Sequence, residues 1–172
     1  MELTQIIDEA FQAAQAGEAS RLKDMIESHP HLANTENRDG LTLLGYAAHM
    51  GNKAAVQELL NHGADVDAVS HSKISYIPSN TALHAAIAGE RNMDVIRLLL
   101  SHRAQTKIFD SNGHTCLHTA AFHDDNLEMI RLLIEHGADV NARMEGGETA
   151  LSLAIKQGNH RVAELLRQNG AL

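Results

Sequence analysis

Residues 41–51 read LTLLGYAAHMG, and three later stretches repeat this pattern of a Thr, a Leu and a run of small residues. These stretches are NTALHAAIAGE at 80–90, HTCLHTAAFHDD at 114–125 and ETALSLAIKQG at 148–158. Their Thr residues, Thr42, Thr81, Thr115 and Thr149, are 39, 34 and 34 residues apart. Periods of this size indicate stacked supersecondary units.

Each repeat is predicted to contain two helices. Thr is a good N-cap, and the side chain three positions later is able to return a hydrogen bond in a capping box; these side chains are His84, His118 and Ser152. An apolar run with helical spacing follows, as at Val56, Leu59 and Leu60. Three such runs end where a left-handed C-cap is expected, at Gly63, Gly137 and Gly170. The prediction is an all-α helical repeat with short β-hairpin loops.

This pattern resembles the ankyrin repeat family, whose units read Asp-x-x-Gly-x-Thr-Pro-Leu-His, two Ala, a Gly, a Val/Leu helix and Gly-Ala-Asp-Val-Asn. The match extends over almost all of residues 42–172. The tetratricopeptide repeat has a similar period, but its Trp and Tyr landmarks are missing here. The resemblance implies an ankyrin-repeat solenoid of five stacked helix-turn-helix units.

The repeat register predicts one domain over residues 1–172. Repeat 1, about 3–36, is read as a degenerate N-terminal cap, because it keeps the two-helix rhythm without the Thr start. The next three repeats are expected at about 37–69, 76–109 and 110–143, and repeat 5, about 144–172, as the C-terminal cap. A loop that we call the finger, residues 68–79, precedes repeat 3 and is longer than its counterparts. Long loops with apolar content are often functional.

Two positions depart from the family pattern. Gly45 stands where the family has His, so the start of that helix is expected to lose its polar return contact. Arg103 replaces a C-cap Gly, and a non-Gly residue held at positive φ costs roughly 1 kcal/mol.

Composition excludes several classes of function. The chain has 14 Lys and Arg against 22 Asp and Glu, a net charge of −8, which is the wrong sign for tracking phosphates. No apolar run is long enough to span a bilayer, and the acidic N-terminal stretch is unlike a secretory signal. Cys116 is the single cysteine and has no internal disulfide partner. We therefore expect a cytoplasmic monomer that binds neither nucleic acid nor membrane.

Catalytic and metal sites are not expected. The 12 His residues follow the repeat register, which separates equivalent positions by roughly 10 Å, too far for shared metal ligation. Cys116 lies near His114 and His118 in sequence, but no orienting Asn or Asp and no oxyanion loop accompany it. We interpret Cys116 as a small hydrophobic residue at a helix start. The prediction is a non-enzyme without cofactor, metal or small-molecule substrate.

The resemblance also implies where a protein partner binds, since ankyrin repeats use their concave side, with hairpin tips and the exposed face of the first helices. The residues predicted to form this site are Tyr46, His49, Met50, Ile74, Tyr76, Ile77, Asn80, His114, Phe122 and His123. Aromatic residues and Met are enriched at interface cores. In the other interpretation, Tyr46 and Phe122 only cover the gap between helix and hairpin.

Two functional classes follow for the whole chain. The first is a protein-protein interaction module or scaffold that holds an unidentified partner. The second is a dedicated inhibitor or immunity-type protein that blocks a partner enzyme. Fold does not decide between them.

Overall fold

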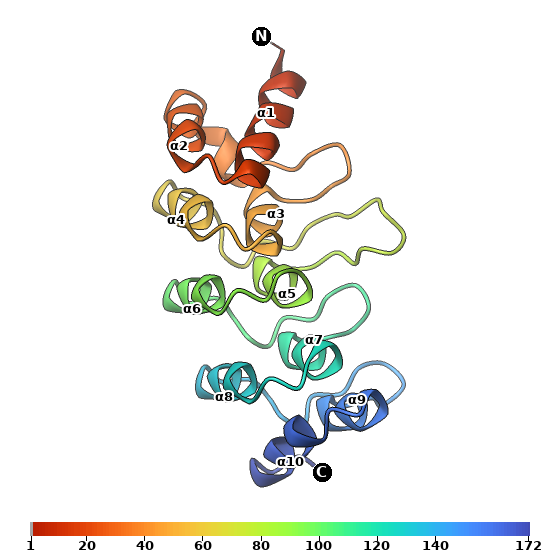
Figure 1. The fold of residues 1–172 in the computed structure, drawn as a ribbon. Helices are drawn as coiled ribbons and strands as arrows, with labels where there is room; N and C mark the ends of the chain where they lie inside the picture. Colours follow the sequence, from red (N-terminus) through yellow and green to blue (C-terminus); the bar gives the residue numbers. More distant parts are fainter. Residues whose placement is uncertain (1) are drawn as a thin grey trace. The chain divides into compact units, whose positions relative to one another are not determined.

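The computed structural model describes residues 2–172, so Met1, where the predicted domain begins, lies outside the described residues. Within this range the secondary structure consists of ten α-helices and one 3-10 helix, with no strand. The helices follow one another in pairs (Figure 1). The prediction of an all-α chain built from repeated helix pairs is confirmed.

The chain forms two compact units, Met1–Ala104 and Gln105–Leu172. Unit 1 contains α1 (Leu3–Ala16), α2 (Ala19–Ser28), the 3-10 helix η1 (Pro30–Asn34), α3 (Leu43–His49), α4 (Lys53–Asn61), α5 (Ala82–Ala88) and α6 (Met93–Ser101). Unit 2 contains α7 (Cys116–His123), α8 (Leu127–Glu135), α9 (Ala150–Gln157) and α10 (His160–Gln168).

Each unit has two layers of helices. In unit 1 the first helices of the pairs, α1, α3 and α5, pack in one layer, and the second helices α2, α4 and α6 form the other (Figure 1). In unit 2, α7 packs on α9 and α8 on α10. Buried Ala residues such as Ala47, Ala86, Ala120 and Ala154 let the first helices approach closely. Leu and Ile residues of the second helices complete the core, including Leu59, Ile96, Leu99, Ile130 and Leu133.

The Thr caps form as the sequence predicts. Thr81, Thr115 and Thr149 each accept a hydrogen bond from the backbone N–H three residues later, and the side chain there returns one in a full capping box. Thr42 accepts from the N–H of Gly45 but receives no side-chain contact in return. The expected loss of that contact at Gly45 is therefore confirmed.

Left-handed residues follow the second helices α4, α6, α8 and α10, whereas α2 ends at His29 with φ of −135°. Gly63, Gly137 and Gly170 have φ values of 90°, 90° and 93°. Arg103 occupies the equivalent position with φ of 66°, as its place in the repeat predicts. Arg91, in the turn between α5 and α6, also has a positive φ of 53°, which the sequence did not indicate.

Asparagine side chains join successive helix pairs within each unit. Asn92, at the start of α6, donates to the carbonyl of Gly51 at 3.1 Å, and Asn159, at the start of α10, donates to the carbonyl of Ala121 at 2.8 Å. Asn52 makes the same contact with the carbonyl of Ala14. Each bond thus ties the start of a second helix to a carbonyl at or just after the end of the first helix in the preceding pair.

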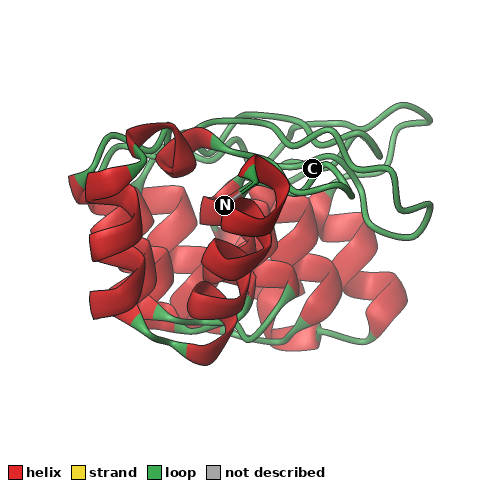
Figure 2. Ribbon diagram, turned by 90° about the horizontal axis from the view of Figure 1, so that it is seen from above, coloured by secondary structure: helices red, strands yellow, loops and turns green. Residues whose placement is uncertain are grey.

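The loops between pairs are hydrogen-bonded turns without strands (Figure 2). Backbone bonds close them, from Asn37 N to Leu41 O at 3.0 Å, from Asp110 N to His114 O at 2.8 Å and from Met144 N to Glu148 O at 3.0 Å. One isolated bridge, between Glu36 and Thr42, is present in the described residues. The predicted hairpins are thus too short to form a ladder.

Candidate functional site

Three of the predicted site residues belong to α3, with Tyr46 in its middle, His49 as its last residue and Met50 as its C-cap. Tyr46 is half-buried, with its ring 5.3 Å from the ring of Phe11, and its hydroxyl donates to Gln15 Oε1 at 3.2 Å. His49 is exposed and Met50 half-buried. The contacts of Tyr46 with α1 agree with the interpretation that its side chain covers a gap between elements. His49 is therefore the most exposed of these three residues.

The finger is built on a hydrogen-bonded base. Ser70 N donates to Asn80 O at 2.9 Å, and Asn80 N donates to Ser70 Oγ at 3.0 Å. Higher up, Ser72 N donates to Ser79 Oγ at 3.0 Å. Asn80, which we predicted as a contact residue, therefore shapes the loop through its backbone.

The preceding loop of unit 1 braces the finger. His71 N donates to Gly40 O at 3.0 Å, and Lys73 N donates to Asp39 O at 2.9 Å. His71 Nδ1 also lies 2.5 Å from Glu36 Oε1. Gly40 has φ of 78°, and a Cβ there would lie 1.9 Å from His71 O, so only Gly permits this close approach. The sequence did not reveal this brace, because it joins residues about thirty positions apart.

The tip of the finger exposes one aromatic ring. Ile77 N donates to Ile74 O at 3.1 Å, which closes a turn around the tip. Tyr76 within this turn is 83% exposed, whereas Ile74 and Ile77 are half-buried. Of the three predicted contact residues at the tip, Tyr76 is thus the most exposed, and the two Ile residues are partly shielded from solvent. The finger reaches farther from the helices of unit 1 than the preceding loop does (Figure 1).

The α3 residues and the finger residues form two separate groups. No hydrogen bond, ion pair or ring contact joins them within the part of the chain that the structure describes. Both belong to unit 1.

Unit 2 holds the remaining predicted residues. Phe122 is 42% exposed at the end of α7, with its ring 5.2 Å from that of exposed His123. His114 is half-buried and its ring stacks 5.9 Å from that of His118. Asp110 Oδ1 accepts from the N–H of His114 at 2.9 Å and fixes this turn. Phe122 and His123 are therefore the accessible pair, and His114 is part of the loop's own structure.

Sequence reasoning missed two exposed apolar residues of unit 2. Phe109, in the loop before α7, and Ile155, on α9, are each 48% exposed. Ile155 comes six positions after its capping Thr, a slot that holds buried Ala48, Ile87 and Ala121 in other repeats. The slot is therefore exposed on α9, although it is buried on α3, α5 and α7.

The loop before α9 carries a charge cluster. Glu148 accepts from the ammonium of Lys156 and from Ser152 Oγ, and these hydrogen bonds lower the pKa of the Glu148 carboxyl below its ordinary value. The pair lies on the exposed side of α9, where exposed ion pairs contribute little to stability. The ion pair holds the side chain of Lys156 close to Glu148, in the loop before α9.

Cys116 and His118 serve packing and capping. Burial raises the pKa of the Cys116 thiol to about 12, and its Sγ donates to Thr106 O at 3.2 Å. His118 Nδ1 accepts from Thr115 N at 3.1 Å, and Nε2 donates to Glu148 O at 3.2 Å. Burial lowers the pKa of His118 below its ordinary value. A neutral thiol and a fully engaged imidazole are poorly suited to nucleophilic catalysis.

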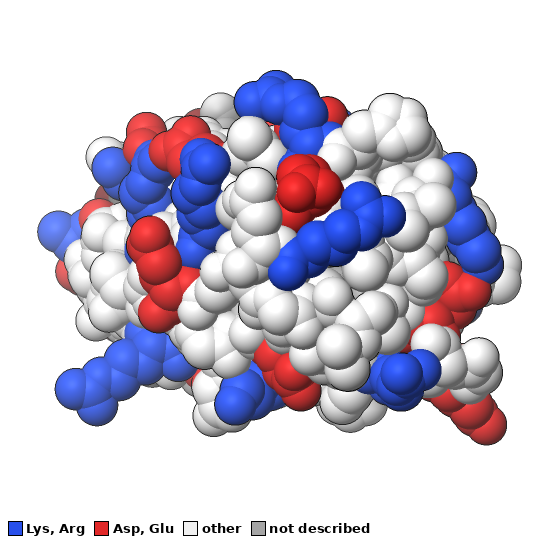
Figure 3. All heavy atoms as spheres, turned by 90° about the horizontal axis from the view of Figure 1, so that it is seen from below, with Lys and Arg blue, Asp and Glu red and all other residues white. Residues whose placement is uncertain are grey.

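The described residues also lack two kinds of feature, a metal-ligand cluster and a membrane-spanning helix. Among residues 2–172 no three His, Cys, Asp or Glu side chains converge as metal ligands would. None of the helices in that range has the length and apolar character needed to cross a membrane. Figure 3 shows Lys and Arg interspersed with Asp and Glu on one face, without a broad patch of a single sign.

Comparison with known proteins returns one family. A family model described as ankyrin repeats (3 copies) matches residues 10–110, 71–144 and 103–172, which together span residues 10–172. A search of curated proteins finds no match to the chain.

Proposed function

Because the chain belongs to the ankyrin repeat family, we propose that it is a non-catalytic module that binds a protein partner through the finger and the exposed ends of its first helices. Ankyrin repeats are generally protein-protein interaction modules. The buried thiol of Cys116 and the engaged imidazole of His118 support a role without catalysis. We further propose that residues 1–172 act as one cytoplasmic, monomeric domain.

The observation that carries this proposal is the exposed ring of Tyr76 on a braced loop. The bonds to Gly40 and Asp39 hold the finger in one arrangement, so little conformational entropy is lost when a partner covers it. Tyr is enriched at interface hot spots because its ring offers a large contact area and its hydroxyl a hydrogen bond. The braced and solvated ring is therefore available for contact with another molecule.

Three single variants test the proposal. Tyr76→Asp and Phe122→Asp place a charge at the two accessible aromatic positions, and we expect both to reduce capture of the native partner at least tenfold, as hot-spot losses do. Ala54→Asp introduces the same charge at an exposed position of α4, in the layer of second helices, and should bind as the unmodified chain does. Calorimetric or surface-plasmon titration with the purified partner gives each Kd.

Melting temperatures separate lost contact from lost fold. Tyr76 lies outside the core, so its substitution should leave the melting temperature unchanged. If both Asp variants retained affinity while Ala54→Asp lost it, the second-helix layer would be the binding surface instead. The same purified complex distinguishes the two functional classes, because a one-to-one complex that silences a partner enzyme identifies an inhibitor, and an active partner identifies an adaptor.

A further inference from the structure

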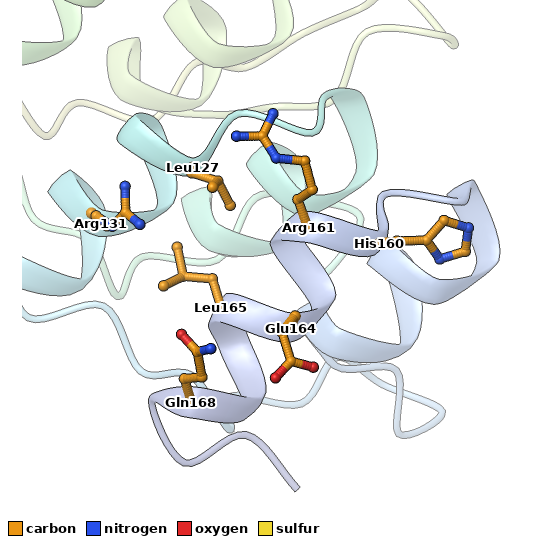
Figure 4. A pocket seen from close by; sticks show the side chains of 7 residues that line it. All are labelled: Leu127, Arg131, His160, Arg161, Glu164, Leu165 and Gln168. Carbon is orange, nitrogen blue, oxygen red and sulfur yellow. The ribbon is translucent and has the colours of Figure 1, made fainter.

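The second-helix layer of unit 2 contains a groove that the proposed function does not use. The groove has a volume of about 410 Å³, is open to solvent and runs between α8 and α10. Leu127 and Leu165 face each other across it and form an apolar floor (Figure 4). Arg131 lies at one side of this floor and Arg161 at the other (Figure 4).

The two arginines at the groove are unpaired. Neither Arg131 nor Arg161 has an ion pair or a side-chain hydrogen bond to any residue in the range 2–172. Glu164, the acidic residue of the lining, lies 3.7 Å from Arg167 on its own helix and so already has a cationic neighbour. The groove is therefore locally cationic in a chain whose net charge is −8.

We propose that this groove is a second interaction surface, which binds an acidic and aliphatic segment of a partner protein. Carboxylates of the segment bind the guanidinium groups of Arg131 and Arg161, which offer paired N–H donors to carboxylate oxygens. A neighbouring Leu-like side chain covers Leu127 and Leu165. Gln168, at the end of the groove, adds an amide that donates to or accepts from the peptide backbone.

Charge and size favour a peptide over other anionic ligands. The groove has two free cations around an apolar floor, which suits one or two carboxylates next to an aliphatic side chain. A nucleic acid would need a longer series of phosphate contacts. At physiological ionic strength, screening over about 8 Å weakens the repulsion from the acidic residues elsewhere on the chain, while the close contacts in the groove persist.

Nuclear magnetic resonance titration of the full chain with short peptides tests the proposal, because chemical-shift mapping detects weak binding. The probe carries Glu-Leu-Glu between Gly-Ser linkers, and matched peptides carry Lys-Leu-Lys or Glu-Ser-Glu. We expect Glu-Leu-Glu to shift amides within α8 and α10, Glu-Ser-Glu to bind several-fold more weakly and Lys-Leu-Lys to produce no shifts there.

Variants assign the effect to the two arginines. Arg131→Gln with Arg161→Gln should weaken binding of Glu-Leu-Glu about tenfold, since each exposed pair contributes a few-fold. Arg143→Gln removes an exposed arginine outside the groove lining and should leave the affinity unchanged. Because Arg131 and Arg161 have no partners within residues 2–172, these changes should preserve the fold, which the unshifted spectrum of the free variant verifies.

Three results would overturn the proposal. Equal binding of the Lys-Leu-Lys peptide would remove the charge argument. Full affinity in the double variant would place the peptide elsewhere. Arginine-dependent binding to vesicles containing phosphatidylserine, together with no shifts from Glu-Leu-Glu, would identify a lipid surface as the ligand instead.

Discussion

Cys116 shows how burial controls reactivity at a single residue. With its pKa raised to about 12, the thiol is almost entirely un-ionised at pH 8. We expect the native chain to react very slowly with an aromatic disulfide reagent at that pH, and the chain unfolded in guanidinium to release one equivalent at once. Rapid reaction of the native thiol would mean that Cys116 is accessible and activated, which would reopen a catalytic role.

His118 links stability to pH. Burial lowers its folded-state pKa below the ordinary value of 6.5, so between these two values the unfolded chain binds more protons than the folded one. Stability from this residue is complete above about pH 6.5 and falls as the pH drops through the folded pKa.

The variant His118→Gln isolates this effect, because Gln at the third helical position also completes a capping box but does not titrate. Urea unfolding at pH 7.5 and pH 5 should show a smaller acid loss of stability for the variant than for the unmodified chain. An equal loss in both would assign the pH dependence to other histidines.

At the scale of the element, the ends of the second helices provide a matched pair of positions. Arg103 and Gly137 occupy equivalent left-handed positions, with φ of 66° and 90°. Arg103→Gly relieves strain of about 1 kcal/mol but makes the unfolded chain more flexible, so it should be neutral or stabilising by up to about 1 kcal/mol. Gly137→Val should destabilise by more than about 1 kcal/mol, although a Cβ there meets no atom within 4 Å. Denaturant melts that gave the opposite order would contradict the assigned backbone.

The finger depends on Gly40. In Gly40→Ala the Cβ would collide with His71 O, so the bonds to His71 and Lys73 should break and free the loop. Trypsin should then cleave after Lys73 faster than in the unmodified chain. Gly146→Ala is the control, because Gly146 has φ of 95° but no atom within 4 Å of a Cβ, so it adds the backbone strain without touching the finger. Equal cleavage in both variants would show that the brace does not order the loop.

The elements also show which features the sequence could predict. Thr caps, their return contacts and the left-handed Gly positions depend on residues within a few positions of each other, and these predictions are confirmed. The brace at Gly40 and the half-burial of Ile74 and Ile77 depend on contacts between separate loops or within a folded tip, which no local pattern encodes. The repeat pattern indicated a long loop before repeat 3 but not the hydrogen bonds that hold it.

At the scale of the whole molecule, the two proposals concern two kinds of exposed surface. The finger and the first-helix ends expose Tyr76, Phe122 and His123, which are among the residues predicted from the sequence. The groove between α8 and α10 was not foreseen, because its character depends on which arginines find partners after folding. The position of a residue in the repeat thus indicates the helix layer to which it belongs. Tertiary contacts determine whether its side chain can bind a partner.

The central claim, that the chain binds a protein through the finger, is tested most directly by site-specific photo-crosslinking. Benzoyl-phenylalanine replaces Tyr76, whose exposure accommodates the larger ring, or Ala54 on α4 as a control. Irradiation in the native extract, followed by mass spectrometry, identifies the crosslinked chain. We predict one dominant partner from position 76 and none from position 54, with the crosslink lost in the presence of excess unmodified chain. Crosslinks from position 54 with none from position 76 would contradict the account.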